Sequence, residues 1–182
     1  MSVFRLKNFD DDCPCPDEHF TGEWIVEWPN GVTKFRANYI DGKEDGERFC
    51  YWENVNLTQK GRMCRGECVG RWTNYHEDGF KTSEYDFIDG QIQGVKKSFW
   101  RNGALMYLHT YRESVLHGVF RAYRHDGSCL YEGVYRDGAP WSGTCEIDVF
   151  EKQADGGYTL LGEFAEGVKI RDLPLPSHEE EE

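Results

Sequence analysis

Residues 94–118, GVKKSFWRNGALMYLHTYRESVLHG, repeat the pattern of residues 70–94, GRWTNYHEDGFKTSEYDFIDGQIQG. Each stretch has an aromatic residue or a histidine six positions after its first glycine, an Asn-Gly or Asp-Gly pair at positions eight and nine, and an aromatic residue at position seventeen. The residues between these positions differ almost everywhere. The sequence therefore predicts a structural repeat that is defined by a few spaced positions.

The repeat occurs six times along the chain. The sixth copy carries four extra residues, after which Gly156, Phe164 and Gly167 return to the pattern, and in the second copy Val55 replaces the glycine at position nine. A short unit in tandem is typical of architectures in which each copy contacts mainly its neighbours. The first glycines of the copies are Gly22, Gly46, Gly70, Gly94, Gly118 and Gly143.

Each copy predicts a β-hairpin. Its first part is rich in aromatic and β-branched residues, as in EWIVEW at residues 23–28, and an Asn-Gly or Asp-Gly turn follows. Both residues of such a pair tolerate positive φ at low steric cost. No window shows a helical period, and frequent glycines would destabilise a helix. The expected turn glycines are Gly31, Gly79, Gly103, Gly127 and Gly156.

The pattern predicts an all-β fold, in which six tandem β-hairpin repeats at residues 21–170 form an elongated, twisted, antiparallel single-sheet solenoid. Residues 1–20 are expected to form an acidic segment that caps the first copy. Residues 171–182, which end in four glutamates, are expected to form a disordered acidic tail.

Alternation along the second strands predicts one face lined by rings and one polar face. Phe35 and Tyr39 are expected on the ring-lined face, and Lys34 and Arg36 on the polar face. In the middle copies the polar face becomes apolar, which predicts either an exposed contact patch or residues that the twisted sheet or the N-terminal segment covers. The residues of this candidate patch are Met106, Leu108, Leu130 and Val134.

Aromatic residues at positions five and six of the copies form two ladders. Because adjacent strand residues point to opposite faces, one ladder must leave the ring-lined face, where its rings could anchor a partner. The sequence does not decide which ladder this is. The candidate partner-binding ladder at position five is Tyr51, Tyr75, Phe99 and Tyr123, and the ladder at position six is Trp28, Trp52 and Trp100.

The formal net charge is −12, of which residues 1–20 contribute −3 and residues 171–182 contribute −4. A body with a net charge of −5 argues against nucleic-acid binding and is compatible with a basic protein partner. No apolar run reaches the length of a membrane helix, and the first residues lack the apolar stretch of a signal peptide. We therefore expect a cytoplasmic protein that does not associate with membranes.

The sequence predicts neither an enzyme nor a cofactor. No nucleophile stands beside a base and an orienting group, and no glycine run has the spacing of a phosphate loop. Cys13, Cys15 and His19 could form half of a zinc site, with Cys64 and Cys68 as the other half. Since there is no export signal, free thiols are the favoured state of the seven cysteines, and no metal is predicted.

Residues 94–118 resemble the MORN-repeat variant of the YwqK-like antitoxin family through Gly94, Trp100, Asn102-Gly103, Tyr111 and Gly118. The resemblance covers about residues 21–167. It implies a cytoplasmic protein-binding module, namely an antitoxin or immunity protein that neutralises a toxin by direct binding. The alternative that it implies is a MORN-type scaffold for protein or membrane-proximal assembly. The expected partner is a protein such as a basic toxin, and exposed edge strands would also allow a homodimer.

Overall fold

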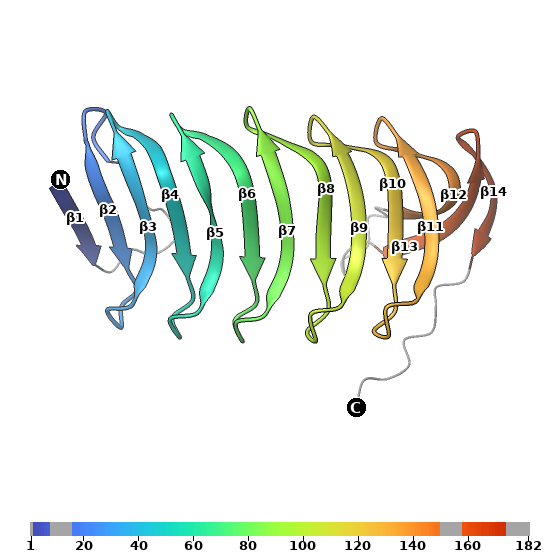
Figure 1. Cartoon of the computed structure of the whole chain (residues 1–182), viewed down its shortest axis with the longest axis horizontal. Helices are drawn as coiled ribbons and strands as arrows, with labels where there is room; N and C mark the ends of the chain where they lie inside the picture. Colours follow the sequence, from blue (N-terminus) through green and yellow to red (C-terminus); the bar gives the residue numbers. More distant parts are fainter. Residues whose placement is uncertain (1, 8–15, 150–157, 174–182) are drawn as a thin grey trace.

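A computed structural model describes residues 2–7, 16–149 and 158–173, which form a single sheet of fourteen strands and contain no helix. The strands follow one another in chain order along the long axis, and each is bent along its length (Figure 1). The predicted elongated all-β sheet is thus confirmed. The strands are β1 (Ser2–Lys7), β2 (Gly22–Glu27), β3 (Thr33–Ile40), β4 (Lys43–Tyr51), β5 (Leu57–Cys64), β6 (Glu67–Tyr75), β7 (Lys81–Ile88), β8 (Gln91–Phe99), β9 (Leu105–Arg112), β10 (Val115–Tyr123), β11 (Cys129–Arg136), β12 (Ala139–Val149), β13 (Tyr158–Ala165) and β14 (Val168–Leu173).

The six predicted hairpins are the successive antiparallel pairs from β2–β3 to β12–β13, and one further strand lies at each end of the sheet. At the N-terminal end, β1 pairs in parallel with β2, from Ser2 opposite Gly22 to Lys7 opposite Glu27. At the other end, β14 continues to Leu173 and so includes the first three residues of the expected tail. Residues 8–15 and 174–182 lie outside the described ranges.

The turn inside each of the first five hairpins has a positive φ at position nine, where four of the copies have glycine and the second has Val55. In the first copy, the Gly31 amide donates to the Trp28 carbonyl at 2.9 Å, and Gly31 has a φ of 84°. Asn30 does not share the positive φ; its side chain accepts a hydrogen bond from the Val32 amide at 2.9 Å and donates to the Glu53 carbonyl of the next copy. The two residues of the Asn-Gly pair therefore have different roles: the glycine adopts the positive φ, and the asparagine side chain makes the hydrogen bonds. Gly79, Gly103 and Gly127 have φ values of 84–89°, and Gly156 lies outside the described residues.

The turns between hairpins join one copy to the next. Both central residues have positive φ, as at Asp41 (46°) and Gly42 (71°), which is the conformation of a tight two-residue β-hairpin turn. The amide of the second turn residue then donates to a carbonyl of the preceding copy or, in the first copy, of the segment before it. This bond recurs as Gly42 to Phe20, Gly66 to Glu44, Gly90 to Cys68, Ser114 to Ile92, Gly138 to Leu116 and Gly167 to Trp141. Neighbouring copies are thus held in a fixed register along one edge of the sheet.

The hydrophobic core lies on one side of the sheet, which we call the ring-lined face. Its N-terminal cluster consists of buried side chains from β2 and β3: Trp24, Val26, Phe35, Ala37 and Tyr39. Its C-terminal cluster surrounds Phe120, which has no exposed surface, together with Ala122 and Tyr135. Between the clusters, Trp72 is 3% exposed and lies against Gly61. Because the strands bend, a single sheet can enclose side chains on this face.

A β-bulge after each turn shifts the alternation of side chains. Val26 pairs with Phe35 and Glu27 pairs with Thr33, so Lys34 is an extra residue in β3. Lys34 lies with Phe35 around one pocket of the ring-lined face, not on the polar face where simple alternation placed it. The same bulge occurs in the other four of the first five hairpins. The prediction for Lys34 was wrong because the period of two does not continue through a bulge.

Replacing Val55 with glycine is expected to stabilise the protein by about 0.5–1 kcal/mol. Val55 has a φ of 69° and is 65% exposed, so it is strained without burying its side chain. A positive φ costs a β-branched residue about 1–2 kcal/mol. Glycine removes this cost, but it also makes the unfolded chain more flexible, and this flexibility offsets part of the gain in stability. The reverse change, Gly103→Val, is expected to destabilise by about 1 kcal/mol or more. Urea unfolding midpoints test both changes, and a lower midpoint for Val55→Gly would contradict the turn geometry.

Candidate functional site

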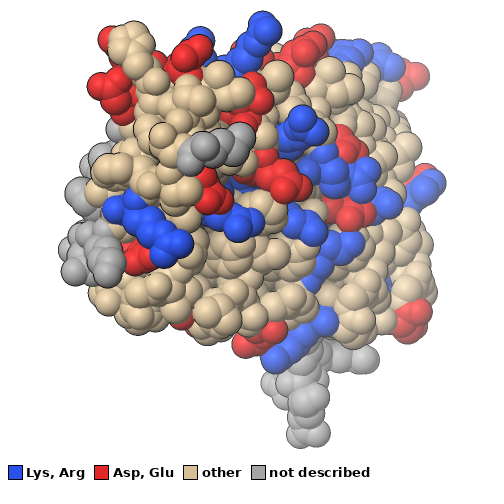
Figure 2. Space-filling model, turned by 60° about the vertical axis from the view of Figure 1, so that its left-hand side comes forward, with Lys and Arg blue, Asp and Glu red and all other residues tan. Residues whose placement is uncertain are grey.

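The side of the sheet opposite the core, which we call the charged face, carries a continuous row of side chains across the strands. Cross-strand pairing places these residues next to one another: Arg5, Ile25, Arg36, Phe49, Lys60, Thr73, Glu84, Lys97, Leu108, Arg121 and Glu132. In Figure 2 a band of Lys and Arg side chains, with Asp and Glu among them, crosses the molecule. The middle of this face is therefore richer in cations than the net charge of the chain suggests.

The ladder at position five lies on the charged face. The ring of Tyr51 stacks on Phe49 with centroids 6.4 Å apart, the Lys60 ammonium lies 5.9 Å from the Tyr75 ring centre, and the Lys81 ammonium lies 4.1 Å from that of Phe99. The four rings of this ladder, Tyr51, Tyr75, Phe99 and Tyr123, are half-buried. Cations held over rings keep these rings in place while leaving part of each ring accessible.

The tryptophans at position six join neighbouring copies. The Trp28 indole donates to the Tyr51 carbonyl at 3.0 Å, and the Trp100 indole donates to the Tyr123 carbonyl at 3.2 Å. Trp52 occupies the equivalent position in the second copy, but its indole nitrogen is buried and has no hydrogen-bond partner among the described residues. The structure thus assigns the two ladders: the position-five rings lie on the charged face, and two of the position-six tryptophans, Trp28 and Trp100, link the copies.

Ion pairs balance the charges at the centre of the charged face. Glu84 lies 2.8 Å from the Lys81 ammonium and within 4 Å of Lys97 and Arg71. The hydrogen bond from Lys81 and the attraction of these cations lower the pKa of Glu84. Arg71 also donates two hydrogen bonds to the Asp86 carboxylate, at 2.6 and 2.9 Å. These pairs fix the rotamers of long side chains, so this part of the face is preorganised for contact.

Only part of the predicted apolar patch lies on one face. Leu108 lies in the row of the charged face between Lys97 and Arg121, and Val134, which pairs with Val119 and stands two residues from Glu132, lies on the same face. Leu130 is the extra residue of a bulge and packs against the core cluster of Phe120, so it is covered, which is one of the two outcomes that the sequence left open. Met106 is the extra residue of the equivalent bulge in the fourth hairpin. The bulges thus set Met106 and Leu130 apart from Leu108 and Val134.

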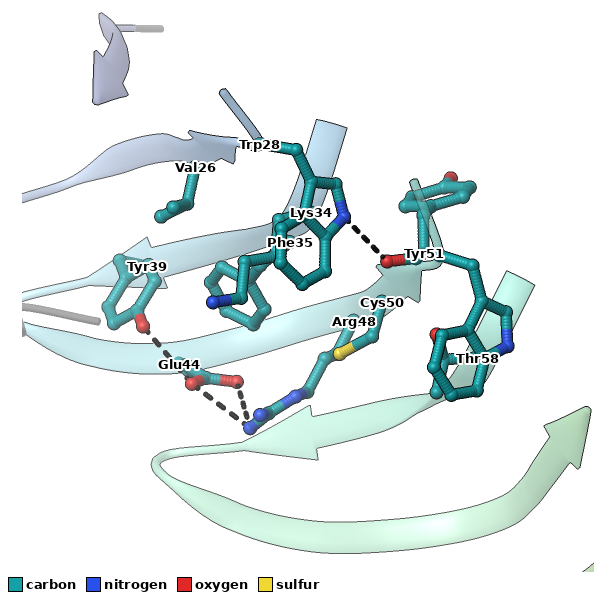
Figure 3. Close-up of a pocket in the computed structure, with 11 residues that line it drawn as sticks. Val26, Trp28, Lys34, Phe35, Tyr39, Glu44, Arg48, Cys50, Tyr51 and Thr58 are labelled. Atoms are coloured by element: carbon teal, nitrogen blue, oxygen red, sulfur yellow. Dashed lines mark hydrogen bonds and ion pairs between the residues drawn. The ribbon is translucent and has the colours of Figure 1, made fainter. Parts of the chain in front are cut away.

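The ring-lined face contains a pocket of about 440 Å³ near β2–β5 (Figure 3). Glu44 lies between Tyr39 and Arg48; it accepts a hydrogen bond from the Tyr39 hydroxyl at 3.1 Å and two from Arg48, each at 3.3 Å. Burial acts to lower the pKa of Arg48, but Glu44, Cys50 and Tyr39 together outweigh this effect, so the pKa is raised. The pocket is lined by Val26, Trp28, Lys34, Phe35, Tyr39, Glu44, Arg48, Cys50, Tyr51, Trp52 and Thr58.

This pocket could not be predicted from the sequence. Its walls come from two copies, and the bulges bring Lys34 and Thr58 to the ring-lined face. One signal was present: Arg48 stands at position two of its copy, where the first, third and fifth copies have Trp24, Trp72 and Phe120. A cation in a row of core rings indicates a polar site within that row.

His109 is a half-buried titratable group of the ring-lined face. It lies opposite Lys96 of β8, and its ring centre is 4.7 Å from that of Phe120. Burial, and to a lesser extent the charge of Lys96, lower the pKa of His109 to about 4. The side chain is therefore neutral at pH 7.

Stability is expected to fall as the pH decreases from about 6.5 to about 4, because the unfolded chain then binds a proton at His109 that the folded chain excludes. The lowered pKa of His109 corresponds to a loss of about 2–3 kcal/mol in the free energy of unfolding, after allowance for partial solvent screening. The packed side chains that face His109 are Lys96, Tyr107, Tyr111 and Phe120. Carboxylates titrate in the same range, so the test compares wild type with His109→Phe. The difference between their unfolding free energies should change by this amount between pH 7 and pH 4, and a constant difference would contradict the assignment.

The structure describes only part of the candidate zinc site. Cys13 and Cys15 lie outside the described residues, while His19 and Cys64 are exposed. The Cys68 thiol lies 3.7 Å from the Met63 sulfur. Within residues 2–7, 16–149 and 158–173, no group of three or more His, Cys, Asp or Glu side chains could hold a metal ion. Nor do these residues form any helix with the length and apolarity needed to span a membrane.

A scan against protein-family models finds no match for this chain, and a search of curated proteins finds none either.

Proposed function

We propose that this protein is a non-catalytic, cytoplasmic module that binds a protein partner through its charged face. The observation that carries the proposal is the ladder of Tyr51, Tyr75, Phe99 and Tyr123, whose rings lie on the open side of the sheet beside ordered cations. Tyrosine and arginine are among the residues that most often anchor protein interfaces. No described element covers this side of the sheet.

The sheet is suited to binding because it is rigid across copies. Hydrogen bonds of the turns and the tryptophans fix each copy against the next, and the ion pairs around Glu84 fix side chains on the charged face. A surface that is already ordered loses little conformational entropy when it binds. The same rings therefore contribute more to affinity than equivalent rings on a flexible loop would.

The most specific form of the proposal is an antitoxin or immunity protein that neutralises a toxin by covering part of its surface. A basic toxin is the preferred partner because carboxylates occupy exposed turns beside the sheet, whereas ion pairs balance many cations in its middle. Acidic rims of this kind speed the encounter with a basic protein. The exposed turn carboxylates are Asp41, Asp89, Glu113, Asp137 and Glu166.

The test is capture of partners from the source organism by the tagged chain, followed by reconstitution with the purified captured protein. We expect a stoichiometric complex that the double change Tyr75→Ser and Phe99→Ser weakens by at least about 30-fold, or about 2 kcal/mol. The matched control is Lys34→Gln, on the opposite side of the sheet, which should leave the affinity unchanged. A complex that tolerates the double change would contradict binding through the charged face.

The second candidate is a structural scaffold of the MORN type, which the resemblance of the repeat implies. Its support here is the open sheet, whose edge strands β1 and β14 carry mostly exposed side chains and could also pair two copies of the chain. Capture of several structural proteins or membrane fragments, without one stoichiometric partner, would favour the scaffold over neutralisation.

A further inference from the structure

The pocket lies on the ring-lined face and shares only Tyr51 with the ladder proposed for partner binding, and its chemistry indicates a different kind of ligand. Its volume of about 440 Å³ lies at the low end of the range of about 300–1,000 Å³ that is typical of small-molecule sites. Val26, Trp28, Phe35 and Tyr39 form apolar walls. A small ligand with a flat apolar body fits these walls.

The charges of the pocket favour an anion. Glu44 and Arg48 form an ion pair with each other, and Glu44 also accepts the hydrogen bond of Tyr39. Lys34 is the remaining charged residue of the lining. Its ammonium lies 4.4 Å from the ring centre of Trp28, and none of the described carboxylates lies within ion-pair distance of it. The lining therefore has one cation more than it has anions, and that cation stands beside an aromatic wall.

One wall of the pocket can move at little cost in hydrogen bonding. Trp28 and Trp100 are held by hydrogen bonds from their indoles to the next copy, but the Trp52 indole makes no such bond. Rotation of Trp52 toward a ligand therefore breaks no hydrogen bond of the protein. A ring stacked on this indole would bury apolar surface of the pocket wall.

We infer that this pocket binds a free, small aromatic carboxylate, whose ring packs among Trp28, Phe35 and Trp52 and whose carboxylate pairs with Lys34. Arg48 positions the site: its ion pair with Glu44 removes the one negative charge that would repel the ligand. This inference concerns the side of the sheet opposite the ladder and does not depend on the partner-binding proposal.

The probe is 3-phenylpropionate, titrated into the full chain and followed by calorimetry and by the indole N–H resonances of Trp28 and Trp52. Two comparison compounds separate the contributions: 3-phenylpropanamide has the ring without the charge, and hexanoate has the charge without the ring. We expect saturable binding of 3-phenylpropionate with shifts of both indole resonances, and at least about tenfold weaker binding of each comparison compound. Equal affinity for the amide, or no binding at about 10 mM, would overturn the inference.

The variant Lys34→Gln should weaken binding of the probe about tenfold. Its matched control is Lys60→Gln, since Lys60 also lies over a ring, that of Tyr75, but on the charged face. An unchanged affinity in Lys34→Gln, or an equal loss in Lys60→Gln, would contradict the assigned site. A further arm uses the tetrapeptide Gly-Gly-Gly-Phe, and tighter binding of this peptide than of 3-phenylpropionate would assign the pocket to a polypeptide C-terminus and refute a free ligand.

Discussion

Replacing Phe120 with alanine is expected to lower the free energy of unfolding by about 3–5 kcal/mol, the largest effect of a single truncation in this chain. Phe120 has no exposed surface, and its ring centre lies 4.7 Å from that of His109, 5.7 Å from that of Tyr131 and 5.9 Å from that of Tyr135. Alanine would leave a cavity that a single sheet has little means to close, because the described strands form one layer.

Equilibrium unfolding in urea measures this loss. Val168→Ala is the control, because Val168 is 66% exposed on β14 and its truncation should change the stability by less than about 0.5 kcal/mol. A loss below about 1 kcal/mol for Phe120→Ala would show that the C-terminal cluster does not enclose this ring.

The second large effect is expected for Gly61→Ala, with a loss of about 3 kcal/mol. A Cβ atom at Gly61 would lie 2.2 Å from Trp72 Cδ2 and 2.3 Å from Cε2, distances that no packed side chain tolerates. Trp72 is 3% exposed and would have to leave its place in the core. Gly61 is thus required because it has no side chain, whereas the turn glycines are required because they have a positive φ.

A double-mutant cycle isolates this contact. In the background of Trp72→Leu, whose smaller side chain leaves room for a methyl group, Gly61→Ala should cost less than about 1 kcal/mol. If the two changes are additive, the close approach of Gly61 and Trp72 is not the cause of the loss. The observable is the midpoint of urea unfolding for the four proteins of the cycle.

Much of the fold could be predicted because its signals are local. Glycines such as Gly31 and Gly103 recur where the chain needs a positive φ, and rings recur where alternation points them to one side. The six hairpins and the ring-lined face follow from these positions. The strand β1 could not be predicted, because its parallel pairing with β2 depends on a contact between residues about twenty positions apart and on no local motif.

The candidate site was predictable only in part. Adjacent strand residues such as Phe99 and Trp100 point to opposite faces, and this rule alone predicts that one aromatic ladder lies outside the core. The positions of Lys34 and Leu130 depend on bulges, which move a residue from one face to the other without a distinctive sequence. The pocket could not be predicted, because two copies contribute its walls and bulges bring Lys34 and Thr58 to the ring-lined face.

The central claim is that this chain neutralises a protein partner by binding it through the charged face. The most direct measurement is growth of cells that express the captured partner alone, with the wild-type chain, or with the variant carrying Tyr75→Ser and Phe99→Ser. The account predicts that the partner alone arrests growth, that the wild-type chain restores growth and that the variant does not, although it folds and accumulates normally. Growth that is unaffected by the partner alone, or that the variant restores as well as the wild-type chain does, would contradict it.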